Sequence, residues 1–209
     1  MLQLIHQLAR SRIQELSPCS LCGIMQQHKH SLCLDCYNSL PWLKTQVLRQ
    51  EMHILTACHY AYPLDKIIQQ FKYEQQLHYQ PMLSGLLKSL KYPKVQAIVP
   101  MPISTERLTH RGYNQSLLLA KDLAKHLKLP IWQPIQRLKQ HSQKGLSRLE
   151  RLEDIQHQFI HAEPTQIRYR KVLIVDDVVT TGSSIQALKQ CLEQLGCQQI
   201  HAVCLASAK

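Results

Sequence analysis

The stretch that decides the fold is VLIVDDVVTTGSS, residues 172–184. Its first four residues, 172–175, are apolar and read as a buried strand that runs directly into Asp176 and Asp177. A small, hydroxyl-rich turn follows at 180–184, where a helical pattern begins. A buried strand that ends in paired carboxylates before a helix N-terminus predicts a ligand site at the carboxyl edge of a parallel sheet.

The residues after this strand suit a phosphorylated sugar with vicinal hydroxyl groups. Backbone N–H groups at a helix N-terminus bind phosphate, and Gly182 lets the chain approach a ligand closely. The flanking hydroxyl side chains add further donors: Thr180, Thr181, Ser183 and Ser184. A phosphate alone needs donors and no carboxylates, whereas ribose hydroxyls can donate to Asp176 and Asp177. The pattern therefore predicts a ribose 5-phosphate site.

Two other nucleotide-binding interpretations of this stretch fail for lack of a partner motif. A Walker B strand requires G-x-x-x-x-G-K-[ST], a Rossmann edge requires G-x-G-x-x-G, and neither occurs in the chain. The remaining alternative is an ordinary strand followed by a helix cap, with one aspartate exposed to solvent.

The rest of the chain alternates apolar runs with amphipathic helices. Helical periodicity over 62–90 predicts two helices with a break near Pro81. Further strands are expected at 95–102 and 199–207, a short strand or extended piece at 130–140, and helices at 114–129 and 183–197. Asn114 is the candidate N-cap of the first of these helices, and Gly196 ends the second. The alternation predicts an α/β fold with a central, mostly parallel sheet.

Four of the eight cysteines have the spacing of a metal site. The pairs Cys19-x-x-Cys22 and Cys33-x-x-Cys36 are ten residues apart, and Gly23 suits the tight turn of such a pair. Two such pairs complete a tetrahedron of thiolates around Zn²⁺ and leave no open position, which predicts a structural ion. One alternative is a redox-active C-x-x-C pair. Another is a site in which a histidine replaces one cysteine, because His28 and His30 lie between the pairs; otherwise these two are exposed loop residues. The remaining cysteines are expected to be buried, inert thiols: Cys58, Cys191, Cys197 and Cys204.

The charge balance points to a polyanionic partner. Twenty-five Lys and Arg against fourteen Asp and Glu leave a formal net charge of +11, which fits nucleic acid or a phosphate-rich small molecule. The alternative is a protein that is basic and soluble without such a partner. No apolar run reaches membrane-spanning length, and residues 1–16 read as a short amphipathic helix without a signal peptide's apolar centre. We expect a cytoplasmic protein with no membrane insertion.

The opening stretch resembles the 5-phosphoribosyl-1-pyrophosphate (PRPP) motif of type I phosphoribosyltransferases. Three further segments are similar to the competence protein F (ComF) family: FKYEQQ (71–76), PMPISTERLTHRGYNQSLLLA (100–120) and RLKQHSQKGLSRLERLEDIQHQF (137–159). That family also carries an N-terminal cysteine zinc module, so the resemblance covers about 17–206. The chain departs from the family pattern at Gln75, where a glycine is expected, and at 151–155, where acids stand in place of the more usual Asn.

The resemblance implies a role for each matching residue of the site. Asp176 and Asp177 hold the ribose 2′ and 3′ hydroxyls, and the following loop wraps the 5′-phosphate with Val178, Thr180, Thr181, Gly182, Ser183 and Ser184. The turn at 100–104, with Pro100, Met101 and Pro102, is the pyrophosphate loop, and Arg107 and Arg111 neutralise pyrophosphate. A hood loop at 137–151 closes over the ligand with Arg137, Gln143, Arg148 and Arg151.

The resemblance also implies an architecture and an activity. A zinc module at 1–55, with a linking stretch from Pro41-Trp42 to about residue 56, precedes a type I phosphoribosyltransferase-like domain at 56–209. Within this domain, hood helices occupy about 56–94 and the core about 95–209. The implied function is Mg²⁺-dependent transfer of phosphoribosyl from PRPP to a base or an amine, with release of pyrophosphate, in DNA uptake during natural transformation. Asp176, Asp177, Arg107 and Arg111 are its candidate catalytic residues.

Two alternatives to catalysis remain. One is a binding module for single-stranded DNA that keeps the PRPP-binding fold and works with other competence proteins, since Tyr73, Tyr79 and Tyr113 lie near basic residues and can stack bases. The other is a regulator that senses PRPP without chemistry.

Overall fold

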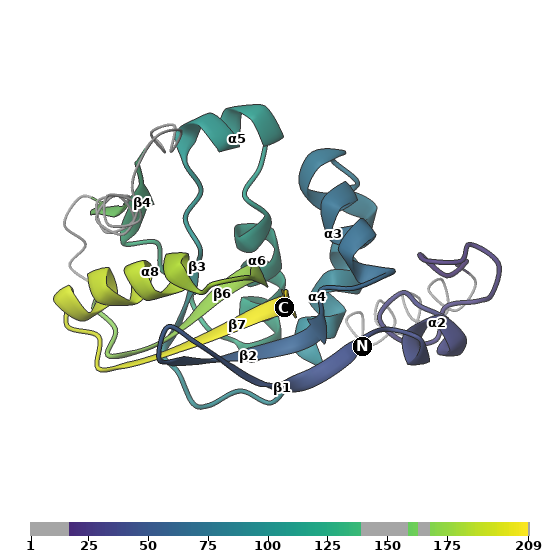
Figure 1. The fold of residues 1–209 in the computed structure, drawn as a ribbon, viewed down its shortest axis with the longest axis horizontal. Helices are drawn as coiled ribbons and strands as arrows, with labels where there is room; N and C mark the ends of the chain where they lie inside the picture. The colour runs from purple at the N-terminus through teal and green to yellow at the C-terminus, as the bar shows by residue number, and fades with distance from the viewer. Residues whose placement is uncertain (1–16, 139–158, 163–167, 209) are drawn as a thin grey trace, which may run out of the picture.

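A five-stranded sheet forms the centre of the molecule (Figure 1). The computed structural model describes residues 17–138, 159–162 and 168–208. The strand order is β1-β2-β7-β6-β3, with β1 (Trp42–Arg49), β2 (Met52–His59), β7 (Gln199–Ser207), β6 (Lys171–Val179) and β3 (Ala97–Pro100). The strands from β2 to β3 are mutually parallel, and β1 is antiparallel to β2. The expected α/β fold with a mostly parallel sheet is confirmed.

Helices cover both faces of this sheet because side chains of its inner strands alternate between two cores. Leu173 and Val175 of β6 face a core built with α3 (Leu64–Tyr73), α4 (Gln80–Lys88) and α6 (Gln115–Leu127). Val172 and Ile174 face the opposite core, with α8 (Ser183–Gln194). A small antiparallel sheet joins that second core, formed by β4 (Ile135–Arg137) and β5 (Phe159–His161). None of the helices in the described ranges is long and apolar enough to span a membrane.

The expectation of a linking stretch up to about residue 56 is wrong, because these residues form the β1–β2 hairpin. β2 pairs with β7 in the central sheet, and Ile54, Ala57 and Cys58 are almost completely buried. The boundary expected at residue 55 therefore falls inside a core strand. The short, mostly apolar run ILTAC (54–58), with β-branched Ile54 and Thr56, was the available sign of this strand.

The helices of the first core begin and end close to the expected positions. α3 ends at Tyr73, and a short 3₁₀ turn, η1 (Leu77–Tyr79), leads into α4. Pro81 lies in the first turn of α4 and so does not break it, because a proline there costs no helical hydrogen bond. Gln75, expected as a departure from a family glycine, adopts φ +54°, the left-handed conformation that glycine favours.

Two expected helix ends are confirmed. The Asn114 side chain accepts a hydrogen bond from the backbone N–H of Leu117 at 3.2 Å and thereby caps α6. Gly196 follows α8 with φ +93°, as a C-terminal glycine does. Between β3 and α6 lies a further short helix, α5 (Thr105–Arg111), with Ser104 as its N-cap. None of the helices expected from the sequence covers α5.

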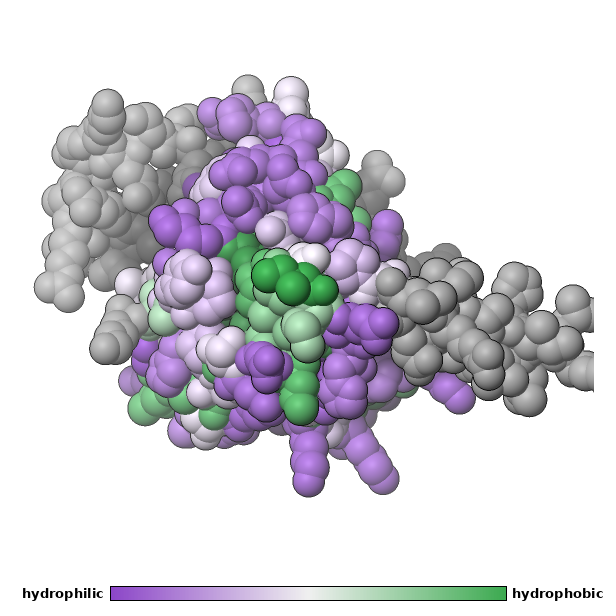
Figure 2. All heavy atoms as spheres, turned by 90° about the vertical axis from the view of Figure 1, so that its right-hand side faces the viewer, coloured by the Kyte–Doolittle hydropathy of each residue, from purple (hydrophilic) through white to green (hydrophobic). Residues whose placement is uncertain are grey.

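The N-terminal module has little apolar core of its own. It contains the two cysteine pairs and the five-residue α2 (Leu34–Asn38), and its apolar side chains Ile24, Met25 and Leu34 are 84%, 54% and 52% exposed. Figure 2 shows the molecule from the right-hand side of Figure 1. On this face a small apolar area lies among hydrophilic side chains. A segment this short requires another source of stability, such as a bound metal ion.

Candidate functional site

A cavity of about 300 Å³ lies at the carboxyl end of β6, beside the turn that follows β3. The two acids of the opening sequence motif, Asp176 and Asp177, line it together with Val178 and Ser184. Residues expected in the pyrophosphate loop also line it, namely Met101 and Pro102, as do three expected cations, Arg107, Arg111 and Arg137. Adjacent parallel strands end at the same edge of a sheet, which is why segments distant in sequence meet here.

The buried carboxylate of Asp177 is paired with a lysine that the sequence analysis did not identify. Lys72 Nζ lies 2.9 Å from Asp177 Oδ1, and the two side chains are 18% and 11% exposed. Asp177 Oδ1 also accepts a hydrogen bond from the backbone N–H of Val178 at 2.6 Å. Burial opposes the charged form of Lys72, but the carboxylates of Asp177 and Asp176 outweigh it, so the pKa of Lys72 is raised. The resulting ion pair fixes the Asp177 carboxylate at the cavity wall.

Asp176 has a different environment. Its Oδ1 accepts hydrogen bonds from Ser116 Oγ and from the backbone N–H of Asp177, each at 2.9 Å. Burial and the adjacent charge of Asp177 raise the pKa of Asp176 to about 7, against the opposing effects of Lys72 and Ser116. The two adjacent carboxyl groups thus have unequal surroundings, because Lys72 contacts Asp177 at 2.9 Å whereas Asp176 accepts hydrogen bonds from a hydroxyl and a backbone N–H.

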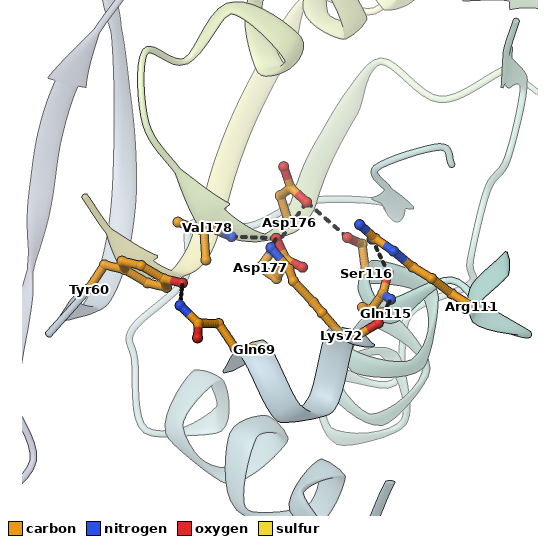
Figure 3. Close-up of polar contacts among 9 residues, drawn as sticks. All are labelled: Tyr60, Gln69, Lys72, Arg111, Gln115, Ser116, Asp176, Asp177 and Val178. Carbon is orange, nitrogen blue, oxygen red and sulfur yellow. Dashed lines mark hydrogen bonds and ion pairs between the residues drawn. The ribbon is translucent and has the colours of Figure 1, made fainter. Parts of the chain in front are cut away.

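The start of α6 holds the end of α3 in place, and with it Lys72 (Figure 3). Gln115 Nε2 donates to the backbone carbonyl of Lys72 at 3.4 Å, and the hydroxyl of Tyr113 donates to the carbonyl of Phe71. Asn114 Nδ2 donates to the carbonyl of Met101 at 3.0 Å, which ties the same segment to the turn after β3. Residues 113–115 therefore connect both walls of the cavity.

The expected arginines approach the cavity from different elements. Arg107 and Arg111 are on α5, and Arg137 ends β4. The Arg111 guanidinium donates to Gln115 Oε1 at 3.2 Å and lies 4.8 Å above the ring of Tyr73, which is 60% exposed. The other three residues expected in the hood loop, Gln143, Arg148 and Arg151, lie outside the described residues.

The expected phosphate loop connects β6 to α8, and only its ends line the cavity. Val178 and Ser184 do so, whereas Thr180 and Thr181 are exposed next to it. The Thr181 and Ser183 hydroxyls lie 2.9 Å apart. Pro100 lines a neighbouring depression of about 530 Å³, which it shares with Pro102. Gly182 adopts φ +82°, and the chain that it approaches closely in the structure is Arg49 of β1.

Residues that the sequence analysis missed come from the elements flanking β6. They are Lys72 and, at the start of α6, Gln115 and Ser116. One sign of Lys72 was available: Leu64, Ile68 and Lys72 are spaced by four, so the lysine continues the buried stripe of α3. A cation on an apolar helix face needs a buried anion, but the sequence does not say which one.

The expected cysteine cluster forms at the N-terminus. The sulfur atoms of Cys19, Cys22, Cys33 and Cys36 all lie within 4.8 Å of one another, and the sulfurs of Cys22 and Cys33 are 3.9 Å apart. Four thiolates about 2.3 Å from one Zn²⁺ would lie about 3.8 Å apart, so the arrangement fits a single tetrahedral ion. Backbone N–H groups of Leu21 and Cys36 donate to the sulfurs of Cys19 and Cys33, which helps to orient these two side chains.

The two histidines between the cysteine pairs lie outside this cluster. His28 is exposed, as expected for a loop residue. The expectation of an exposed side chain is wrong for His30, whose ring packs against Gly85 of α4, where a Cβ would lie 2.5 Å from His30 Cβ. Burial and nearby lysines lower the pKa of His30 to about 4. His30 therefore anchors the module on α4 as a neutral side chain.

Comparisons with known proteins agree with this architecture. Residues 114–209 match the phosphoribosyl transferase domain. Competence protein F of Haemophilus influenzae is 31% identical over 95% of this chain and 88% of its own length. DNA utilization protein YhgH of Escherichia coli is 30% identical over 90% of this chain and 82% of its own length. Competence protein ComFC of Bacillus subtilis is 26% identical over 90% of this chain and 77% of its own length. With similarity along nearly its whole length, the chain belongs to the competence protein F family.

Proposed function

We propose that the cavity binds PRPP with Mg²⁺, and that the protein transfers the phosphoribosyl group to a base or an amine with release of pyrophosphate. The observation that carries the proposal is the pairing of Asp176 and Asp177 at the end of β6, beside a loop that leads into the N-terminus of α8. Carboxylates accept hydrogen bonds from ribose hydroxyls, and the loop's N–H groups and hydroxyls can donate to the 5′-phosphate. A volume of about 300 Å³ is at the small end for ligand pockets and suits a compact polar molecule.

The cations around the acids support a pyrophosphate leaving group. Arg107 and Arg111 on α5 and Arg137 on β4 bring three guanidinium groups to the wall that faces Asp176 and Asp177. In the proposed reaction the bond between C1 of ribose and the pyrophosphate oxygen breaks, and a bond from C1 to the acceptor nitrogen forms. Preorganised cations stabilise the charge that develops on pyrophosphate. Mg²⁺, held mostly by oxygens of the ligand and water, would neutralise that charge further.

Asp176 can also take part in proton transfer. An acceptor amine or base loses a proton as its nitrogen bonds to C1, and a group with a pKa of about 7 suits a base at neutral pH. Asp177, held by Lys72 at 2.9 Å, would then be the carboxylate that orients the sugar.

We infer that this chemistry serves DNA uptake. The names of the relatives, competence protein F and DNA utilization protein, support this inference. The zinc identity of the N-terminal ion is part of the same proposal, since four thiolates are a ligand set typical of structural zinc.

Calorimetric titration with PRPP and Mg²⁺ tests the ribose assignment. Asp177→Asn should raise the dissociation constant at least about tenfold, because a charged acceptor of a ribose hydroxyl is lost. The matched control is Asp65→Asn, at the other end of α3 from Lys72, where the side chain accepts a local hydrogen bond from the Lys66 N–H. Equal PRPP affinity in wild type and Asp177→Asn would refute the assignment. Pyrophosphate release in a screen of bases and amines then separates an enzyme from a PRPP-binding regulator.

Binding of single-stranded DNA is a second candidate function, favoured by a specific contact. Arg111 and the exposed ring of Tyr73 form a cationic, aromatic part of the cavity wall. Such pairs stack bases and attract the phosphate backbone without sequence preference. DNA binding and PRPP binding would share Arg111, because this residue lines the cavity and also lies above the Tyr73 ring.

A further inference from the structure

Arg49, the last residue of β1, contacts the loop between β6 and α8. Its Nε donates to the carbonyl of Thr180 at 2.9 Å, across 131 residues of sequence. Its Nη2 donates to the carbonyl of Ala208 at 3.0 Å and to Ser207 Oγ at 3.3 Å. Nη1 donates to the carbonyl of Leu48 at 3.0 Å, which holds the guanidinium against its own strand. One planar side chain therefore joins the β1–β2 hairpin, the end of β7 and the loop after β6.

The stem of Arg49 also determines which residue can occupy position 182. A Cβ built on Gly182 would lie 2.7 Å from Arg49 Cβ, closer than real Cβ contacts, and the φ of Gly182 is +82°. Glycine is required there both by the backbone conformation and by the close approach of the hairpin. The tight turn of the loop and the position of Arg49 thus depend on each other.

The hydrogen bond to Thr180 has a consequence for the ligand side of the loop. The carbonyl and the N–H of a trans peptide group point in opposite directions. Because Arg49 holds the Thr180 carbonyl on the hairpin side, the N–H of Thr181 in the same peptide group points away from the hairpin. A loop that binds phosphate through its N–H groups must keep their directions fixed before the ligand arrives, since ordering them on binding would cost affinity.

We propose that Arg49 is a positioning residue that presets the 180–184 loop for the 5′-phosphate. The proposal rests on the proposed function only for the identity of the ligand. Arg49 does not line the cavity, so it acts through the loop and not on the ligand itself. This proposal also gives a role to the β1–β2 hairpin, which joins the cysteine module to the central sheet. Its first strand, β1, ends at Arg49, the residue that holds the 180–184 loop.

Two substitutions separate the parts of this contact. Arg49→Met keeps a long stem against Gly182 but removes the donors to Thr180, Ser207 and Ala208. Arg49→Lys keeps the charge but cannot reproduce the planar fork. Arg170→Met is the matched control, because Arg170 is exposed and precedes β6 at the end of the strand opposite to the acids.

We would measure PRPP affinity with Mg²⁺ by calorimetry, and hydrogen–deuterium exchange of the 180–184 amides without ligand. For Arg49→Met we expect a dissociation constant raised roughly tenfold and faster loop exchange, because all donors of the guanidinium group are lost, including the one to Thr180. For Arg49→Lys we expect about a threefold weakening, and for Arg170→Met no change. Exchange elsewhere in β6 and β7 should stay at the wild-type level, whereas a merely structural defect would raise it throughout the sheet.

The outcomes distinguish this proposal from the proposed function. If wild type binds PRPP and Arg49→Met binds it equally well, the positioning role is overturned while the PRPP site stands. If wild type binds no PRPP, the proposed function fails, and loop exchange alone decides the role of Arg49. Faster exchange confined to 180–184 in Arg49→Met then supports preset loop geometry, and unchanged exchange overturns it.

Discussion

At the scale of single residues, the cavity is defined by two adjacent carboxyl groups with unequal surroundings. Lys72 Nζ contacts Asp177 at 2.9 Å, while Asp176 accepts hydrogen bonds from Ser116 and a backbone N–H. Burial and the adjacent Asp177 raise the pKa of Asp176 to about 7, so this carboxyl can change its protonation near neutral pH. A site with one fixed carboxylate and one titrating carboxyl can bind hydroxyl groups and exchange a proton at neutral pH.

This asymmetry predicts how stability depends on pH. The folded protein keeps the proton on Asp176 up to pH about 7, whereas the unfolded chain releases it near the ordinary pKa of 3.8. The stabilising effect of this group is therefore complete below pH 3.8 and is lost as pH rises toward 7. Asp176→Asn should remove this loss of stability at high pH, because the amide does not ionise. Its oxygen can still accept the hydrogen bonds from Ser116 and from the Asp177 N–H.

We expect the free energy of unfolding of Asp176→Asn to exceed that of wild type by about 1–2 kcal/mol at pH 8. At pH 4 the two free energies of unfolding should be nearly equal. Urea unfolding across this pH range measures the difference, and PRPP binding should weaken in the same variant. Parallel pH profiles for the two proteins would show that Asp176 ionises normally in the fold.

At the scale of elements, the cysteine module has few buried apolar residues of its own, while the hairpin after it is part of the central sheet. Apolar residues of the module such as Ile24 are exposed, whereas Ile54 of β2 is 1% exposed in the second core. We expect a bound zinc ion to stabilise this segment, since zinc binding contributes on the order of 10–16 kcal/mol in isolated zinc fingers. The module and the sheet should therefore respond differently to loss of metal.

Cys22→Ser should lose nearly all bound zinc and expose the chain before Trp42 to protease, while the sheet remains folded. Elemental analysis and limited proteolysis measure these two effects. Cys197→Ser is the matched control, because the Cys197 thiol donates to the Tyr169 carbonyl at 3.0 Å and a serine hydroxyl can do the same. Full zinc retention in Cys22→Ser would contradict a four-cysteine site.

At the scale of the whole molecule, the excess of 25 basic over 14 acidic residues sets long-range electrostatics. A net charge of +11 attracts polyanions, and the rate and affinity of such association fall as salt screens the charge. The Asp176–Asp177 pair, in contrast, acts only at contact distance inside the cavity.

Affinity for single-stranded DNA should therefore fall steeply with salt. We expect a plot of log K against log salt concentration to have a slope of about −2 or steeper, equivalent to roughly three phosphate contacts. Fluorescence anisotropy with an unstructured oligonucleotide measures it. Asp177→Asn should leave this slope unchanged, and a slope near zero in wild type would rule out DNA binding driven by the basic surface.

Local sequence patterns were sufficient wherever a feature depends on neighbours along the chain. The apolar strand before Asp176, the Asn114 cap and the cysteine spacing follow from short-range rules of burial, capping and ligand geometry. The same rules placed the acids at the carboxyl edge of a parallel sheet. At Gln75, where the family pattern has a glycine, the backbone adopts the left-handed conformation that glycine favours.

The partners of those features were decided only by the tertiary structure. The sequence marks Lys72 as an unusual cation on a buried face, but the packing of α3 beside β6 brings it to Asp177. Arg49 looks like an ordinary hairpin residue until the sheet order places β1 where it can reach Thr180. Patterns with a period of two or of 3.6 residues specify which face of an element is buried. They carry no information on which distant element covers that face, because this depends on the packing of the whole chain.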